Sequence, residues 1–188
     1  MPKKNLRPAV FLDRDGTINV PPEHRHITRW EEFRFVPGAL RAIRRLSKAG
    51  WILVVASNQS GVGRKAMTRA ALSGITRRML QEIRRSGGRI DAVYYCLHPP
   101  ASGCSCRKPR LGMLEKAARA LKIDLRKSFV VGDTETDVLM GRAAGCRSIL
   151  VLTGHQTRKT ARRLVVPPDK IVPNLEEAAR MILRNRLR

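Results

Sequence analysis

The chain has 188 residues, 43% of them hydrophobic and 28% charged, which is typical of one globular domain, here expected to span residues 1–188. No apolar stretch approaches the ~20 residues that cross a bilayer, and the basic N-terminus has no signal-length apolar region, so we exclude a membrane protein and expect a cytoplasmic location. The net charge of +23 would suit a polyanion, but only 4% of the residues are aromatic, so we expect solvated arginine faces that bind polyanions nonspecifically at low salt.

Apolar runs and helical periodicities alternate along the chain. In chain order, the expected elements are a strand at 9–12, an irregular segment at 21–35, a helix around 40–46, a strand at 51–56, a helix around 72–83, a strand at 92–95, an irregular segment at 97–112, a helix around 114–121, a strand at 129–131, a helix around 138–144, a strand at 148–152 and a final helix after Asn174. Asn174 and Glu177 have the spacing of a capping box for the final helix. Long irregular segments in a compact domain are usually functional loops.

The order of these elements indicates the fold class. The expected strands are continuous apolar runs, as in parallel sheets that are covered on both faces. Strands that alternate with helices favour β-α-β units and a mostly parallel sheet. We therefore predict an α/β fold with a Rossmann-like, doubly wound, mostly parallel sheet and helices on both faces.

Acidic residues follow two of the expected strands. Asp13 and Asp15 come directly after the strand at 9–12, while Asp133 and Asp137 follow the strand at 129–131. The carboxyl ends of parallel strands lie at one edge of the sheet, so these carboxylates should converge. Their repulsion would be relieved by a hard divalent cation with oxygen ligands, and we predict magnesium.

Four segments carry a resemblance to a known family. FLDRDGTIN, SNQSGVGR, RKP and VGDTETD occur in this order and are similar to the four motifs of the haloacid dehalogenase superfamily of phosphohydrolases. The resemblance implies a magnesium-dependent phosphomonoester hydrolase. It implies that Asp13 is the nucleophile that forms an aspartyl-phosphate, and that Asp15 is the general acid and later the general base. It also implies that Asp13, Asp133 and the backbone carbonyl of Asp15 bind Mg²⁺. Asp137 could be a further ligand, or could orient the ligands or interact with the helix dipole.

The same resemblance implies a phosphate-binding set on the other motifs. Ser57 and the residues after it would hydrogen-bond the phosphate oxygens, and Lys108 would supply the opposing positive charge. The residues after Ser57 in this set are Asn58, Gln59 and Ser60.

A cysteine and histidine cluster lies in the irregular segment at 97–112 and directly before it. Cys96, His98, Cys104 and Cys106 have the types and the spacing of zinc ligands, and four such ligands close a structural tetrahedral site. The alternatives are free thiols or a disulfide, which a cytoplasmic location disfavours. We predict a structural zinc ion in this loop.

The zinc loop narrows the resemblance within the superfamily. Together with CRKPRLGML and RAAGC, it resembles small members without a large cap domain that act on heptose 1,7-bisphosphate or on histidinol phosphate. This implies a phosphorylated sugar as substrate and removal of its C7 phosphate, with Arg107 on the distal part of the sugar phosphate and a substrate loop that includes Pro21 and His24. His26 and His24 are otherwise expected to face solvent. Thr134 stands where the heptose enzymes commonly have lysine, which leaves the exact substrate open.

Two alternatives remain. The first is a histidinol-phosphate phosphatase, which would use the same chemistry. The second is a polynucleotide 3′-phosphatase or a nucleic-acid-associated protein that uses the charge of +23, although related end-processing phosphatases would not be expected to carry the zinc loop. We expect no specific nucleic-acid partner, no membrane partner and a monomer.

Overall fold

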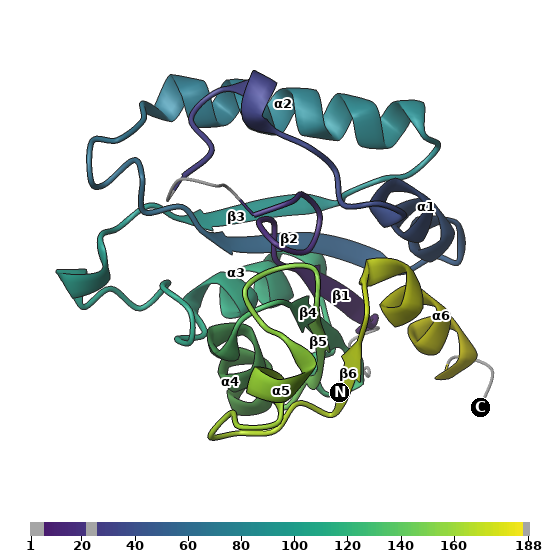
Figure 1. Cartoon of the computed structure of the whole chain (residues 1–188). Coiled ribbons are helices and arrows are strands. Elements are labelled where there is room, and N and C mark those ends of the chain that lie inside the picture. The colour runs from purple at the N-terminus through teal and green to yellow at the C-terminus, as the bar shows by residue number, and fades with distance from the viewer. Residues whose placement is uncertain (1–5, 22–25, 186–188) are drawn as a thin grey trace.

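Six parallel strands form the central sheet (Figure 1). The computed structural model describes residues 6–21 and 26–185. The strand order is β3-β2-β1-β4-β5-β6, and every neighbouring pair is parallel. The strands are β1 (Ala9–Leu12), β2 (Ile52–Asn58), β3 (Ala92–Cys96), β4 (Phe129–Gly132), β5 (Arg147–Val151) and β6 (Lys170–Val172). The order reverses between β1 and β4, which is where open α/β sheets bind their ligands.

Helices cover both faces of this sheet. Val10 and Leu12 of β1 belong to the core cluster that includes residues of α1, α2 and α6, while Ala9 and Phe11 belong to the cluster with α3 and α4. The two faces of one strand thus bury two separate helical layers, which confirms the predicted doubly wound architecture. The helices are α1 (Ala39–Lys48), α2 (Arg69–Arg85), α3 (Gly112–Leu121), α4 (Glu135–Ala143), α5 (Arg158–Ala161) and α6 (Leu175–Asn185), with 3-10 turns η1 (Trp30–Glu32), η2 (Pro100–Ser102) and η3 (Leu125–Lys127).

The sequence did not reveal every element. The strand β6 was missed because it has only three residues and begins with the exposed Lys170. The helix α5 has four residues, too few for a helical periodicity to be seen. At the start of α6, Asn174 Oδ1 accepts from the backbone N–H of Glu177 at 3.0 Å, as expected of a cap, but the Glu177 carboxylate accepts from Arg180. The expected capping box is therefore borne out on the Asn174 side.

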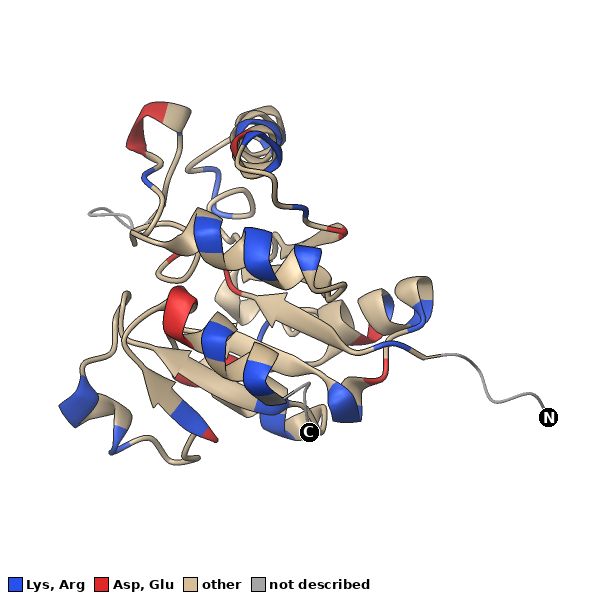
Figure 2. Cartoon of the chain, turned by 90° about the vertical axis from the view of Figure 1, so that its right-hand side faces the viewer, with Lys and Arg blue, Asp and Glu red and all other residues tan. Residues whose placement is uncertain are grey.

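The basic residues are distributed over the surface. Figure 2 shows bands of Lys and Arg on several separate helices of one side of the molecule, with acidic residues near some of them. Some basic residues form ion pairs: Arg41 of α1 lies 2.9 Å from Glu176 of α6, and Arg180 lies 3.1 Å from Glu177. Within the described ranges, we find no helix with the length and apolar character needed to cross a bilayer.

Candidate active site and metal centres

Three carboxylates meet at the edge of the sheet between β1 and β4. The backbone N–H of Asp13 donates to the carbonyl of Val131 at 2.9 Å, so the chain just beyond β1 stays beside β4. Asp13, Asp133 and Asp137 are buried, and one oxygen atom of each lies within 4.8 Å of the others. The predicted convergence of acidic residues from separate strand ends is present, and the group could hold a metal ion.

Lys108 partly compensates this charge. Its Nζ lies 2.8 Å from Asp13 Oδ1 and 2.7 Å from Asp137 Oδ1, and its side chain is only 2% exposed. Burial lowers the pKa of Lys108, but the two carboxylates outweigh it and raise the pKa above its ordinary value. The other oxygen of Asp137 accepts from the hydroxyl of Thr134 at 2.6 Å, which closes a capping box at the start of α4. Both Asp137 oxygens thus have partners, which favours an orienting role over direct metal binding.

Of the three carboxylates, Asp133 has the fewest contacts that offset its negative charge. It is 0% exposed, and no ion pair within 4 Å reaches it in the described part of the chain. Its Oδ2 accepts from the backbone N–H of His155 at 3.0 Å, while its buried Oδ1 has no hydrogen-bond partner among the described residues. Burial, with the charges of Asp13 and Asp137, raises the pKa of Asp133 to about 8. A divalent cation would satisfy this oxygen and remove the repulsion.

Two glycines leave the space that the Asp133 carboxylate occupies. Gly16 has a φ of 79°, and a Cβ there would overlap the Asp133 carboxylate. A Cβ at Gly154 would overlap the same carboxylate from the loop after β5. The hydroxyl of Thr153 donates to the carbonyl of Gly16 at 2.6 Å and ties these two glycine-containing turns together. Glycine is therefore required at both positions for Asp133 to reach the cluster.

Magnesium binding should depend on pH through Asp133. Since its pKa is raised from 3.8 to about 8, the folded metal-free protein keeps a proton that the unfolded chain has lost, so its stability falls as the pH rises through that range. Magnesium held by Asp133 would have to displace this proton, so its affinity should fall up to about tenfold for each pH unit below the pKa. We expect 10 mM MgCl₂ to raise the Tm more at pH 8.5 than at pH 6.0. Equal Tm increments at the two pH values would contradict this, and Asp133→Asn should abolish the increment.

Asp15 points away from the metal group. Its carboxylate accepts from the Arg14 guanidinium at 2.8 Å, from Asn19 Nδ2 at 2.9 Å and from Gln59 Nε2 at 2.8 Å. Burial favours the neutral form of Asp15, but Arg14 and these hydrogen bonds outweigh it and hold the pKa below its ordinary value. The Asp15 side chain is not one of the three carboxylates that approach within 4.8 Å of one another. Its hydrogen bonds therefore keep this side chain apart from the three-carboxylate group.

The residues after β2 surround Asp13 and Lys108. Burial raises the pKa of Asp13, and a hydrogen bond from Ser57, which is 2% exposed, partly opposes this shift. Asn58 Oδ1 accepts from the backbone N–H of Lys108 at 3.1 Å and so fixes the third motif against the second. Gln59 donates from Nε2 to Ser57 at 3.2 Å as well as to Asp15, and is itself buried. Gln59 therefore bonds Ser57 and Asp15 from within the protein.

A cavity of about 370 Å³ opens above these groups, a volume that suits a small phosphorylated molecule. The buried Nη1 of Arg107 has no hydrogen-bond partner among the described residues, and Arg107 lines this cavity. Pro21 is half-buried and does not line it, while His24 lies outside the described residues. The cavity is lined by Asp13, Asp15, His26, Ser57, Asn58, Ser60, Arg64, Pro100, Arg107, Lys108, Asp133, Thr134, Thr136 and His155.

Several of these residues were not expected from the sequence. His26, which was expected to face solvent, lines the cavity and packs near Gly61. Arg64, at the end of the SNQSGVGR segment, lines it as well. The loop after β5 contributes Gly154 and His155, although it carries no acidic residue that would have marked it. Its position after a buried strand at the same sheet edge was the only available signal.

The cysteine and histidine cluster has the dimensions of a zinc site. The sulfur of Cys104 lies 3.6 Å from those of Cys96 and Cys106, and His98 Nδ1 lies 3.3 Å and 3.7 Å from the sulfurs of Cys106 and Cys96. Tetrahedral zinc would separate two sulfurs by about 3.8 Å, and a sulfur and a nitrogen by about 3.5 Å. The cysteines are not joined by disulfides. The four groups therefore fit one zinc ion better than thiol pairs.

This cluster lies beside the segment that carries Arg107 and Lys108, which line the cavity. Cys96 is the last residue of β3, and its carbonyl accepts from the backbone N–H of Gln59 at 2.8 Å. Arg110 donates to the Cys104 carbonyl at 2.6 Å, which closes the loop on itself. Arg107 follows the last cluster residue directly. An ion held by these ligands would hold in place the segment that carries Arg107 and Lys108, two cationic residues of the cavity.

Comparisons with known proteins agree with this geometry. A family profile described as HAD-hydrolase-like matches residues 105–178. The D-glycero-beta-D-manno-heptose-1,7-bisphosphate 7-phosphatase of Pseudomonas aeruginosa is 37% identical over 158 residues, which cover 84% of this chain and 88% of that protein. The enzyme of the same name from Escherichia coli K12 is 37% identical over 186 residues, covering 95% and 89%. The crystal structure of the D,D-heptose 1,7-bisphosphate phosphatase from B. bronchiseptica, complexed with magnesium and phosphate, is 36% identical with a TM-score of 0.88, covering 95% of this chain and 99% of that one.

Proposed function

Because the chain belongs to the haloacid dehalogenase-like phosphatases, we propose that it removes the C7 phosphate of D-glycero-D-manno-heptose 1,7-bisphosphate through a covalent intermediate on Asp13. The observation that carries this proposal is the position of the Asp13 carboxylate, which lines the cavity and lies 2.8 Å from Lys108. The names of the 7-phosphatase relatives support the choice of substrate.

In the first half-reaction, an oxygen of Asp13 attacks the phosphorus and the bond from phosphorus to the sugar oxygen breaks. Asp15 gives its proton to that departing oxygen, so the sugar 1-phosphate leaves with a hydroxyl group at C7 rather than an alkoxide. Arg14 holds the resting Asp15 ionised, but a bound phosphate brings negative charge close to it and favours the protonated form. Lys108 and the groups at Ser57 stabilise the charge that the three phosphoryl oxygens carry during transfer.

In the second half-reaction, Asp15 is a carboxylate again and takes a proton from water. The water oxygen bonds to phosphorus while the bond to Asp13 breaks, which releases inorganic phosphate and restores the Asp13 carboxylate. The Arg14 contact favours the ionised form that this step requires. One carboxyl group can thus serve as acid and then as base because the charge beside it changes between the two steps.

Magnesium would be held by the side chains of Asp13 and Asp133, with the backbone carbonyl of Asp15. The uncompensated Oδ1 of Asp133 and the presence of magnesium in the Bordetella relative's structure support this assignment. When bound, the ion would offset the repulsion between the carboxylate nucleophile and the phosphate anion. Zinc in the four-residue cluster would have a structural role, and Arg107, beside it, would bind the distal part of the sugar phosphate.

A panel of substrates tests the assignment. We expect kcat/KM to be at least about tenfold higher for one anomer of heptose 1,7-bisphosphate than for histidinol phosphate, because a second phosphate adds charged contacts at Arg107. Faster turnover of histidinol phosphate than of either heptose anomer would contradict the proposed substrate and leave the chemistry intact. Tight binding to duplex ends that persists at moderate salt would instead favour the polynucleotide alternative.

A further inference from the structure

Arg14 is a fully buried charge that was not expected from the sequence to belong to the site. It is 0% exposed and is among the largest fully buried side chains. Burying a guanidinium is costly unless it is paired and hydrogen-bonded. Its pairing is with Asp15: Nε and Nη2 lie 3.0 Å and 2.8 Å from Oδ1, and Nη2 also lies 3.0 Å from Oδ2. This fully buried guanidinium therefore contacts the proposed acid and base.

The Asp15 carboxylate is held from several directions. In addition to Arg14, Asn19 donates to Oδ1 and Gln59 donates to Oδ2. Asn19 is itself 0% exposed, and its Nδ2 also donates to the carbonyl of Val20 at 2.8 Å. These contacts use both carboxylate oxygens. Rotation of Asp15 toward the metal group would break them all and would add a further carboxylate to an already crowded cluster.

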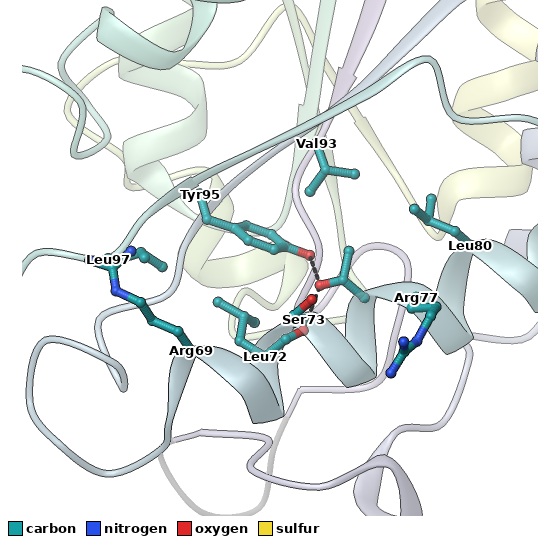
Figure 3. A pocket seen from close by; sticks show the side chains of 9 residues that line it. Arg69, Leu72, Ser73, Arg77, Leu80, Val93, Tyr95 and Leu97 are labelled. Atoms are coloured by element: carbon teal, nitrogen blue, oxygen red, sulfur yellow. Dashed lines mark hydrogen bonds between the residues drawn. The ribbon is translucent and has the colours of Figure 1, made fainter.

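Arg14 also interacts with Tyr95. The guanidinium carbon lies 6.0 Å from the centre of the Tyr95 ring, a distance at which a cation and an aromatic ring still attract each other. The Tyr95 hydroxyl hydrogen-bonds to Thr76 at 3.1 Å, the dashed line in Figure 3. The Thr76 hydroxyl donates to the Leu72 carbonyl at 2.8 Å. A chain of contacts thus runs from α2 through Thr76, Tyr95 and Arg14 to Asp15.

Tyr95 does not line the active-site cavity. It lines a separate groove of about 440 Å³ between α2 and β3, together with Leu72 and Val93 (Figure 3). A substitution at Tyr95 therefore changes the support of Arg14 without touching residues at the proposed reaction centre.

We propose that Arg14 is a positioning residue that holds the Asp15 carboxylate on the leaving-group side of the site and off the metal, and that Tyr95 keeps Arg14 in place. This inference rests on the proposed function, since it assigns a role through Asp15. It predicts that disturbing Arg14 impairs proton transfer to the leaving group more than phosphate binding or attack by Asp13.

The leaving group supplies a test that a merely structural role would not satisfy. An alkoxide leaves slowly without a proton donor, whereas 4-nitrophenolate leaves readily as an anion. Arg14→Lys keeps the charge but loses the planar fork that binds both carboxylate oxygens. We expect it to lower kcat/KM for the sugar phosphate by about 100-fold, within the range of general acid catalysis, and to lower kcat/KM for 4-nitrophenyl phosphate by less than about threefold. Equal losses on both substrates would overturn the proposal.

Two further variants keep the test decisive if Arg14→Lys folds poorly. Tyr95→Leu should show the same selective loss to a smaller degree, while Tyr94→Phe, at the neighbouring position on β3, should show none.

A double mutant tests the same role on the sugar phosphate alone. Arg14→Lys should not lower kcat/KM any further in an Asp15→Asn background, because the group that it positions is gone. Additive losses there would contradict the inference. Full activity of Asp13→Asn would instead overturn the proposed function, so the two failures are distinguishable.

Discussion

Asp13→Asn is expected to lower kcat by roughly 10⁴-fold or more, because the amide cannot form the covalent intermediate that divides the displacement into two easier steps. The residual rate would come from positioning and from the cationic groups around the phosphate. No phosphorylated protein should accumulate in a single turnover, whereas the wild-type chain should carry an acyl phosphate that hydroxylamine cleaves.

The same substitution should leave the fold intact. Burial raises the pKa of Asp13, Lys108 opposes this shift and Asp137 adds to it, so the ionised carboxylate is held at a cost. Asparagine removes that cost, and Lys108 keeps its contact with Asp137 at 2.7 Å. We therefore expect the free energy of unfolding to change by no more than about 2 kcal/mol. Denaturant unfolding monitored by circular dichroism would measure it.

Asp124→Asn provides a matched control for Asp13→Asn. Asp124 accepts from the backbone N–H of Arg126 at 3.1 Å at the start of η3 and does not line the cavity, and asparagine can accept the same hydrogen bond. Its kcat should stay within about twofold of the wild type, as is usual for a surface substitution. Turnover by Asp13→Asn within tenfold of this control would exclude Asp13 as the nucleophile.

Much of this site follows from the sequence because its parts obey simple rules. The strands are continuous apolar runs, and a parallel sheet brings their carboxyl ends together, which is why Asp13 and Asp133 meet. The zinc ligand types are paired at one-residue gaps, and Cys96 at the end of β3 places the first pair beside the loop that carries the second. The charge of the aspartates and the spacing of the cysteines and histidine were therefore sufficient to predict that each group comes together.

The remaining features depend on side-chain direction, which spacing does not fix. Arg14 and Asp15 are adjacent in sequence, and nothing in DRDG shows that the first would fold back onto the second. The turn around Gly16, with its φ of 79°, makes that contact possible. His155 reaches Asp133 through a backbone N–H, a donor that every residue except proline carries and that therefore leaves no mark in the sequence.

Loss of a proposed zinc ligand should have a large effect on stability. We expect Cys106→Ser to abolish stoichiometric zinc and to lower the Tm by about 10 °C, since losing about 3 kcal/mol shifts a domain of this size by roughly 6–12 °C and structural zinc often contributes more. The sulfur of Cys106 lies 3.3 Å from His98 Nδ1 and 3.6 Å from Cys104, so its removal opens one corner of the tetrahedron. Metal analysis and a thermal melt would measure the two effects.

The loss should also reach the chemistry, because Cys106 directly precedes Arg107 and Lys108. With the loop unfixed, KM should rise and kcat should fall together, since both cationic groups lose their position. Cys146→Ala is the matched control: Cys146 is a buried cysteine, 5% exposed, that lies outside the cluster. It should keep one zinc per chain and near-normal kinetics. A Cys106→Ser protein with the Tm and kcat/KM of this control would show that the cluster does not stabilise the loop.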